Sequence, residues 1–146
     1  MLIDLKNSLG FKINKTSNHM LSIINPILAE FDIAIEQRAT LEIIKYEDDV
    51  TLTKIAAILD KDKTTISRTV RVLEKKALIQ RNNNSEDRRS TMLELTSKGE
   101  ETLNNSQESI TKFRNDLISN LSKEEIDTLF NLLDKVVLGL DSNKHD

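Results

Sequence analysis

Apolar residues recur every three or four positions between residues 62 and 77, which is the spacing of one face of an α-helix. The predicted buried face comprises Ile66, Val70, Leu73 and Ala77. Asp62 precedes this pattern and is placed to cap the helix. The opposite face carries hydroxyl and cationic side chains with no acidic residue among them: Thr64, Arg68, Arg71 and Lys75. A helix with such a face suits the groove of a nucleic acid.

A shorter apolar pattern lies just before this helix, in the segment LTKIAAIL. Its predicted core-facing residues are Leu52, Ile55, Ala56 and Leu59. The residues from Asp60 to Asp62 are predicted to form a tight turn. Two short helices joined by a turn of about three or four residues form a helix-turn-helix, whose second helix enters the major groove of DNA.

Two short strands are predicted after the second helix, at 78–83 and 90–95, because apolar and polar residues alternate in the latter segment. The connecting segment NNNSEDRRS is polar, turn-forming and carries two arginines, so the strands should form a hairpin wing. The predicted fold class is therefore mainly α with a small β-hairpin. A winged helix-turn-helix lobe would occupy residues 32–99.

Helical patterns also precede the lobe. Apolar residues at helical spacing run from Leu9 to Phe31, and because Pro26 interrupts them we expect one long first helix that is bent near Asn25. A further helix is predicted at 35–46.

After the wing, Thr96 or Ser97 is predicted to start a long helix, with Glu100 or Glu101 completing a capping box. Ser122 followed by Glu125 predicts a second capping box and a last, apolar helix.

The terminal helices are too apolar to be left in contact with water. We therefore predict that residues 1–31 and 100–146 are dimerisation helices that pair with a second copy. A two-fold dimer would place two recognition helices in successive major grooves of a pseudo-palindromic site. The competing interpretation is a monomeric helical bundle that carries a wing.

The amino-acid composition excludes several classes of catalytic and metal-binding site. The chain of 146 residues contains no cysteine, which excludes disulfides, thiol catalysis and zinc-ribbon sites. Its two histidines, His19 and His145, make a transition-metal site unexpected, and neither a phosphate loop nor a catalytic triad is present. We expect no cofactor and no enzymatic activity. No apolar run approaches the ~18 residues of a membrane span, so we expect a cytoplasmic protein that does not bind membranes.

Charge is distributed unevenly along the chain. Residues 61–89 contain nine basic and four acidic residues, a net charge of +5, whereas the whole chain carries -3. The remainder therefore carries -8. One basic surface on an acidic body indicates a localised nucleic-acid site, although a charge run can also be a solvated helix face.

Together, LTKIAAIL, DKTTISRTVRVLEKKALI, and EDRRS leading into LELTSKGE resemble the MarR family of bacterial transcription regulators. That family has a D-x-R element in the wing before an LTxxG segment, matched here by Asp87 to Arg89 and by Leu95 to Gly99. The resemblance implies a homodimer with interlocking terminal helices that binds double-stranded DNA, most often as a repressor.

The resemblance also implies roles for single residues. Arg89 would enter the minor groove and Asp87 would orient it, while Arg88 would share that role or contact a phosphate. In the recognition helix, Thr64, Thr65 and Arg68 are the candidates to contact bases. The candidates to contact phosphates are Ser67, Arg71 and Lys75.

Two positions depart from the family pattern, because Asp60 and Ala77 stand where many relatives have glycine. Aspartate tolerates the left-handed conformation better than most residues, whereas alanine adopts it only with strain. The expected accommodation at Ala77 is a longer last turn of the recognition helix.

A small effector, often aromatic and anionic, is a further partner that the resemblance implies, and it would release the protein from DNA by a population shift. Its binding residues are not identified. His19 is a candidate because its charge can change near neutral pH, and the competing interpretation is a surface or interface histidine.

The alternative function is a winged-helix protein-interaction module without specific DNA binding. Such a module would be expected to carry apolar or acidic residues at Thr64, Arg68 and Arg89, which this chain does not.

Overall fold

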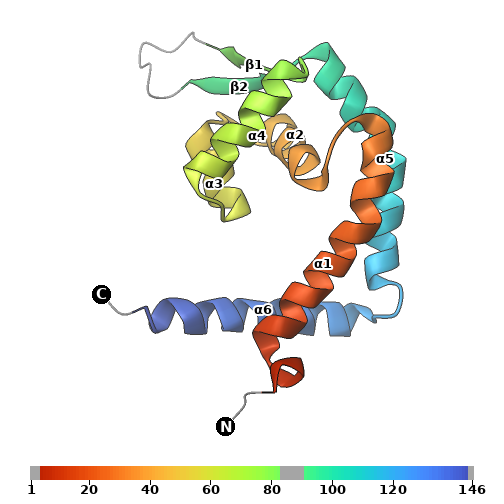
Figure 1. Ribbon diagram of the computed structural model, residues 1–146, viewed down its shortest axis with the longest axis vertical. Coiled ribbons are helices and arrows are strands. Elements are labelled where there is room, and N and C mark those ends of the chain that lie inside the picture. Colours follow the sequence, from red (N-terminus) through yellow and green to blue (C-terminus); the bar gives the residue numbers. More distant parts are fainter. Residues whose placement is uncertain (1–3, 83–90, 145–146) are drawn as a thin grey trace. The chain divides into compact units, whose positions relative to one another are not determined.

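The computed structural model describes residues 4–82 and 91–144. Within them the protein is mainly helical with one two-stranded antiparallel hairpin, which confirms the predicted fold class (Figure 1). The predicted wing residues Asp87, Arg88 and Arg89 lie outside the described residues.

The chain divides into two compact units, Met1–Ser109 and Ile110–Asp146, and helix α5 (Ser97–Ile118) contains the boundary between them. The predicted functional division, with a lobe at 32–99 between dimerisation helices, concerns assembly and stays a prediction.

The first unit contains both short and long helices before the hairpin. In chain order these elements are the 3-10 turn η1 (Leu5–Asn7), α1 (Leu9–Leu28), the 3-10 turn η2 (Ala29–Phe31), α2 (Ile35–Tyr46), α3 (Leu52–Leu59), α4 (Lys63–Lys75), β1 (Ile79–Asn82) and β2 (Met92–Leu95). The helix predicted at 35–46 matches α2 residue for residue. Pro26 lies in the last turn of α1, which ends two residues later at Leu28.

The helix-turn-helix forms as its apolar pattern predicts. Ile66, Val70 and Leu73 on α4 are completely buried, as are Ile55 on α3 and Leu41 on α2. Three helices therefore contribute to one core. Full burial of an aliphatic side chain stabilises a fold by about 1.5 to 3 kcal/mol relative to leaving it exposed, so this core holds α4 firmly.

The hairpin pairs Ile79 with Leu95 and Asn82 with Met92, and its strands lie side by side in Figure 1. The backbone N–H of Leu93 donates to the carbonyl oxygen of Val50 at 2.8 Å, which ties the strand to the segment that precedes α3. Leu93 is also buried. The base of the wing is thus connected to the helix-turn-helix by both a hydrogen bond and apolar packing.

The end of α4 corrects one expectation. Ala77 is not part of a longer helix or of its buried face, because α4 ends at Lys75 and Ala77 is exposed with a φ of 59°. The N–H groups of Ala77 and Leu78 donate to the carbonyl oxygens of Glu74 and Leu73 at 2.9 and 3.0 Å. These two bonds are the Schellman motif, which requires the left-handed conformation at Ala77.

The end of α3 is built in the same way. The N–H groups of Asp60 and Lys61 donate to the carbonyl oxygens of Ala57 and Ala56 at 3.3 and 3.0 Å, and Asp60 has a φ of 51°. The expectation that aspartate would accept the left-handed conformation here is confirmed.

A buried arginine, which the sequence pattern did not reveal, connects α2 to α5 within the first unit. Arg38 is 1% exposed. Its Nε donates to Ser106 Oγ at 2.9 Å, and its Nη2 donates to Gln107 Oε1 at 3.0 Å and to the Leu103 carbonyl at 3.3 Å. It also pairs with Glu42. The cost of burying this charge is offset by these partners.

The second unit contains the end of α5 and the helix α6 (Lys123–Ser142). The capping box predicted for α6 is confirmed, since Glu125 N–H donates to Ser122 Oγ at 3.1 Å and Ser122 N–H donates to Glu125 Oε1 at 2.9 Å. None of the α6 residues is buried. Among residues 4–82 and 91–144, no helix combines the length and the apolar character needed to cross a membrane.

Candidate nucleic-acid interface

The start of α4 is held by Asp62. Its Oδ1 accepts a hydrogen bond from the Thr65 N–H at 2.7 Å, which satisfies one of the free donors of the first turn. This bond lowers the pKa of Asp62 below its usual value, and the Thr65 hydroxyl, the Thr64 N–H and the charge of Arg68 act in the same direction. The cap therefore remains ionised at neutral pH.

The outer surface of α4 presents the side chains that its sequence pattern predicted. Thr64, Arg68, Arg71 and Lys75 are exposed, whereas Thr65 and Ser67 are half-buried. The three residues of the opposite face, Ile66, Val70 and Leu73, are completely buried. Because the apolar face is held in the core, the polar face has a defined direction.

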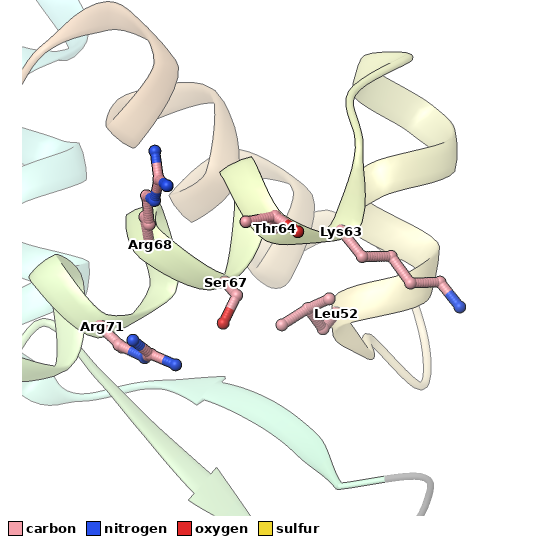
Figure 2. A pocket seen from close by; sticks show the side chains of 6 residues that line it. All are labelled: Leu52, Lys63, Thr64, Ser67, Arg68 and Arg71. Carbon is pink, nitrogen blue, oxygen red and sulfur yellow. The ribbon is translucent and has the colours of Figure 1, made fainter.

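A groove of about 500 Å³ runs between α4 and the beginning of α3. Its lining comprises Leu52, Lys63, Thr64, Ser67, Arg68 and Arg71. Figure 2 shows Ser67 and Leu52 approaching one another across this groove, with Lys63 and Arg71 extending on either side of them. Cationic ends around a hydroxyl group make a surface that can accept the phosphate of a nucleic-acid backbone.

Leu52 and Lys63 were not among the predicted site residues. Lys63 is the first residue of α4, and its positive charge at the start of a helix with a cationic face was a usable sign. Leu52 belonged to the predicted core face of α3 and is half-buried, so no pattern indicated that it lines the groove.

The LTxxG segment positions the other end of α4. Thr96 Oγ1 donates to the Ala77 carbonyl at 2.6 Å, and Lys98 Nζ donates to the Lys76 carbonyl at 3.0 Å. A Cβ atom on Gly99 would lie 2.0 Å from the Leu78 carbonyl oxygen, so only glycine fits there. The segment is therefore a clamp on the residues that follow the recognition helix.

Thr96 also caps α5, because its Oγ1 accepts the Gly99 N–H at 3.0 Å. The predicted capping box with Glu100 or Glu101 does not form, since the third residue of the helix is glycine and has no side chain to reach back. Glu100 instead lies 3.5 Å from Lys45.

Comparisons with known proteins agree with this geometry. The sequence profile of the MarR family matches residues 33–91, which include α2, α3, α4 and β1. A MarR/EmrR family regulator from Acinetobacter superposes with a TM-score of 0.87, at 28% identity, over 96% of this chain and 99% of that one. The Staphylococcus aureus MepR–DNA complex superposes with a TM-score of 0.83, also at 28% identity, over 90% of this chain and 98% of the other. By sequence over residues 33–91, and by fold over nearly its whole length, this chain resembles the MarR family.

Two curated relatives of this chain come from Bacillus subtilis. The HTH-type transcriptional regulator YdcH is 33% identical over 63% of this chain and 65% of its own length. The HTH-type transcriptional regulator YdgJ is 26% identical over 64% of this chain and 57% of its own length. The alignments thus span less than two thirds of the curated relatives.

One acidic residue of α4 has a basic partner. Glu74 is the only acidic residue between Lys63 and Lys75, and its carboxylate pairs with Arg81 of β1, with 2.9 Å between Oε1 and Nη2. The count of basic residues in the sequence could not show that the guanidinium of Arg81 is already paired with Glu74.

The histidines considered as effector or metal ligands do not belong to the surface of α4. His19 is exposed on α1, and its carbonyl oxygen accepts the Ser22 hydroxyl at 2.6 Å. It does not line the groove beside α4. His145 lies outside the described residues. Within residues 4–82 and 91–144, no group of three or more His, Cys, Asp or Glu residues is arranged to hold a metal ion.

Proposed function

We propose that this protein is a sequence-specific DNA-binding transcriptional regulator of the MarR family that acts as a homodimer. The observation that carries the proposal is the exposed face of α4, on which Thr64, Arg68, Arg71 and Lys75 project from a helix whose other face is fully buried. An amphipathic helix with hydrogen-bonding and cationic groups on its free face fits the major groove of B-DNA.

The residues of α4 divide into two proposed groups. Thr64, Thr65 and Arg68 contact base edges, because they belong to the N-terminal half of the helix. The Thr65 side chain can exchange a hydrogen bond through its hydroxyl or place its methyl group against thymine.

The second group positions the protein on the duplex. Ser67 and Arg71 line the groove beside α3, where a phosphate would fit, and Lys75 extends the row of contacts. For the wing, Asp87, Arg88 and Arg89 are proposed from the family resemblance, with Arg89 in the minor groove.

Relatives support DNA as the partner. The MepR structure at 28% identity is a complex with DNA, and the B. subtilis relatives are named as transcriptional regulators. These proteins share the helix-turn-helix with this chain, which carries a recognition surface of its own on α4.

The homodimer is proposed from the second unit. Large apolar side chains of α6 are exposed in the single chain, among them Phe130 at 64% and Leu138 at 66%. Contiguous exposed apolar surface is typical of an interface. Two lobes related by a dyad would contact half-sites about 34 to 36 Å apart, so the operator should be a pseudo-palindrome.

Repression and release by a small effector are finer proposals that follow from the family. A protein that occupies a promoter blocks it. An effector would release it only through a higher affinity for a conformation that does not fit the operator.

The experiment compares binding to a duplex from the upstream region of the protein's own gene with binding to a scrambled duplex of equal length, across a salt series. The variants are wild type, Arg68→Ala and the control Lys123→Ala, which removes an exposed cation from the start of α6. We expect wild type and the control to prefer the native duplex at ~150 mM salt, and Arg68→Ala to lose about 1 to 3 kcal/mol on that duplex and less on the scrambled one.

A different result would support the alternative. If neither duplex binds, or if both bind equally with affinity that vanishes as salt rises, the lobe is a protein-interaction or non-specific module.

A further inference from the structure

The pair between Glu74 and Arg81 has a two-pronged geometry. Arg81 Nε lies 3.1 and 3.2 Å from the two carboxylate oxygens of Glu74, and Arg81 Nη2 lies 2.9 Å from Oε1. Both nitrogens of one edge of the guanidinium therefore engage the same carboxylate. Such bidentate pairs fix the relative orientation of the two groups, which a single contact does not.

Among the described residues, further ion pairs between separate segments of the first unit lack this geometry, and one of them joins Lys54 to Glu47 at 3.5 Å. Lys45 and Glu100 lie 3.5 Å apart, as do Lys76 and Asp32. The Glu74–Arg81 pair is also partly shielded, with 31% of the Glu74 side chain and 42% of the Arg81 side chain exposed. Exposed pairs contribute little to stability unless their geometry is close to ideal, and this pair meets that condition.

The pair lies where the packing between helix and sheet ends. Successive side chains of a strand alternate between its two faces, so Arg81 shares a face with Ile79, which is 3% exposed. On α4, Glu74 directly follows Leu73, which is completely buried. The ion pair thus continues the contact between β1 and α4 one step beyond the apolar core.

The charge of Glu74 requires compensation if α4 approaches DNA. It is the only carboxylate within a helix that carries Lys63, Arg68, Arg71 and Lys75. An unpaired carboxylate there would be repelled by the phosphates. Arg81 neutralises it through the two-pronged pair.

We propose that Glu74 and Arg81 are positioning residues that fix strand β1, and with it the base of the wing, against the recognition helix. The inference rests on the proposed function, because a fixed strand matters when helix and wing contact one duplex together. Besides neutralising the charge of Glu74, the pair orients strand β1 relative to α4.

Arg81→Lys separates these two contributions. Lysine keeps the positive charge but has no planar fork, so neutralisation of Glu74 is retained and the two-pronged geometry is lost. Glu74→Gln removes the charge of one partner and releases Arg81. The matched control is Glu100→Gln, which removes a carboxylate from a single-contact pair in the same unit and outside α4.

The measured quantities are the ratio of affinities for the native and scrambled duplexes and the slope of affinity against salt. We expect Arg81→Lys to lower the ratio by about tenfold with an unchanged slope, since the charge is conserved. Glu74→Gln should lower the ratio and steepen the slope by about 0.9, because the released arginine neutralises a phosphate. Glu100→Gln should behave as wild type. A wild-type ratio in Arg81→Lys would overturn the proposal and leave neutralisation as the role of the pair.

Amide hydrogen exchange of the free proteins makes the inference independent of DNA binding. We expect amides of Ile79–Asn82 to exchange faster in Arg81→Lys and Glu74→Gln than in wild type or Glu100→Gln. If wild type fails to distinguish the two duplexes, the proposed function is wrong. The exchange rates of the β1 amides alone then decide whether the Glu74–Arg81 pair positions the strand. Unchanged exchange in both variants would overturn the positioning role.

Discussion

Helices α4 and α6 both carry apolar residues at helical spacing, but these residues have opposite environments. The apolar residues Ile66, Val70 and Leu73 of α4 are completely buried within the first unit, whereas α6 has no buried residue and exposes Leu138 at 66%. The apolar face of α4 is therefore satisfied inside its own chain. That of α6 is left for contacts that the single chain does not supply.

The two helices are therefore stabilised in different ways, one by packing within the chain and, in the proposed dimer, the other by association. The recognition helix is oriented by packing that does not depend on protein concentration. The free energy of an apolar surface such as that of α6 is gained on association, so its contribution grows with concentration. In the proposed regulator, each copy would carry a preformed DNA-contacting face, and assembly would set the spacing between copies.

The largest expected effect comes from the same truncation in the two helices. Leu73→Ala should lower the free energy of unfolding of the lobe by about 2 to 5 kcal/mol at every protein concentration, because it leaves a cavity in a closed core. Leu138→Ala should change it by less than about 0.5 kcal/mol, since that side chain is exposed in the single chain. Hydrogen exchange of α4 and of the hairpin measures both values. Equal losses would show that α6 supports the lobe directly and would break the comparison.

A second contrast uses two of the helical glycines, Gly99 in α5 and Gly139 in α6. Gly99→Ala should destabilise the lobe by about 3 kcal/mol, because the new Cβ would lie against the Leu78 backbone and force α5 away from the end of α4. Nothing lies within 4 Å of a Cβ at Gly139 in α6. Gly139→Ala should therefore increase helix stability by about 0.5 to 1 kcal/mol. Urea unfolding and circular dichroism test both, and a tolerated alanine at position 99 would contradict the clamp.

A smaller effect distinguishes the ends of the two helices of the helix-turn-helix. Ala77→Gly should raise the free energy of unfolding by about 1 kcal/mol, because glycine adopts the positive φ without strain. Asp60→Gly should give a smaller gain, since aspartate tolerates that conformation. The urea midpoints at constant slope provide the measurement. A gain at Asp60 as large as that at Ala77 would mean that φ strain is not the cause.

The smallest effect is the pH dependence of the α4 cap. The pKa of Asp62 is lowered in the folded protein, chiefly by the Thr65 N–H, so its contribution is present above the ordinary pKa and is lost as pH falls through the lowered value. We expect stability to decrease below about pH 4 in wild type, with this component absent in Asp62→Asn, which keeps a neutral capping oxygen. The unperturbed pKa of aspartate is about 3.9, so thermal unfolding of the two proteins would be compared between about pH 2 and 5. Identical profiles would show that the cap has no role in acid stability.

Much of the fold could be predicted from the sequence because the deciding interactions are local. Asp62 and Ser122 bond to residues three positions away, and the buried face of α4 follows from a spacing of three and four residues. The same locality made the polar face of α4 predictable, since the side opposite a buried stripe must face outward.

Other features depend on contacts between distant segments, and no pattern along the chain indicated them. Arg38 bonds to residues of α5 that are 65 to 69 positions away. The groove beside α4 includes Leu52 because two helices meet there. Arg81 could be counted as a cation from the sequence, but only the tertiary structure pairs it with Glu74.

The end of α4 shows both levels at once. The sequence alone determined that a helix with a cationic face starts at its aspartate cap and that a hairpin follows, because backbone propensity and periodicity act within a turn or two. The tertiary structure decided that Ala77 adopts a positive φ. The carbonyl oxygens of Ala77 and Leu78 accept hydrogen bonds from Thr96, 19 and 18 positions away, and the combined contacts outweigh the local strain of one alanine.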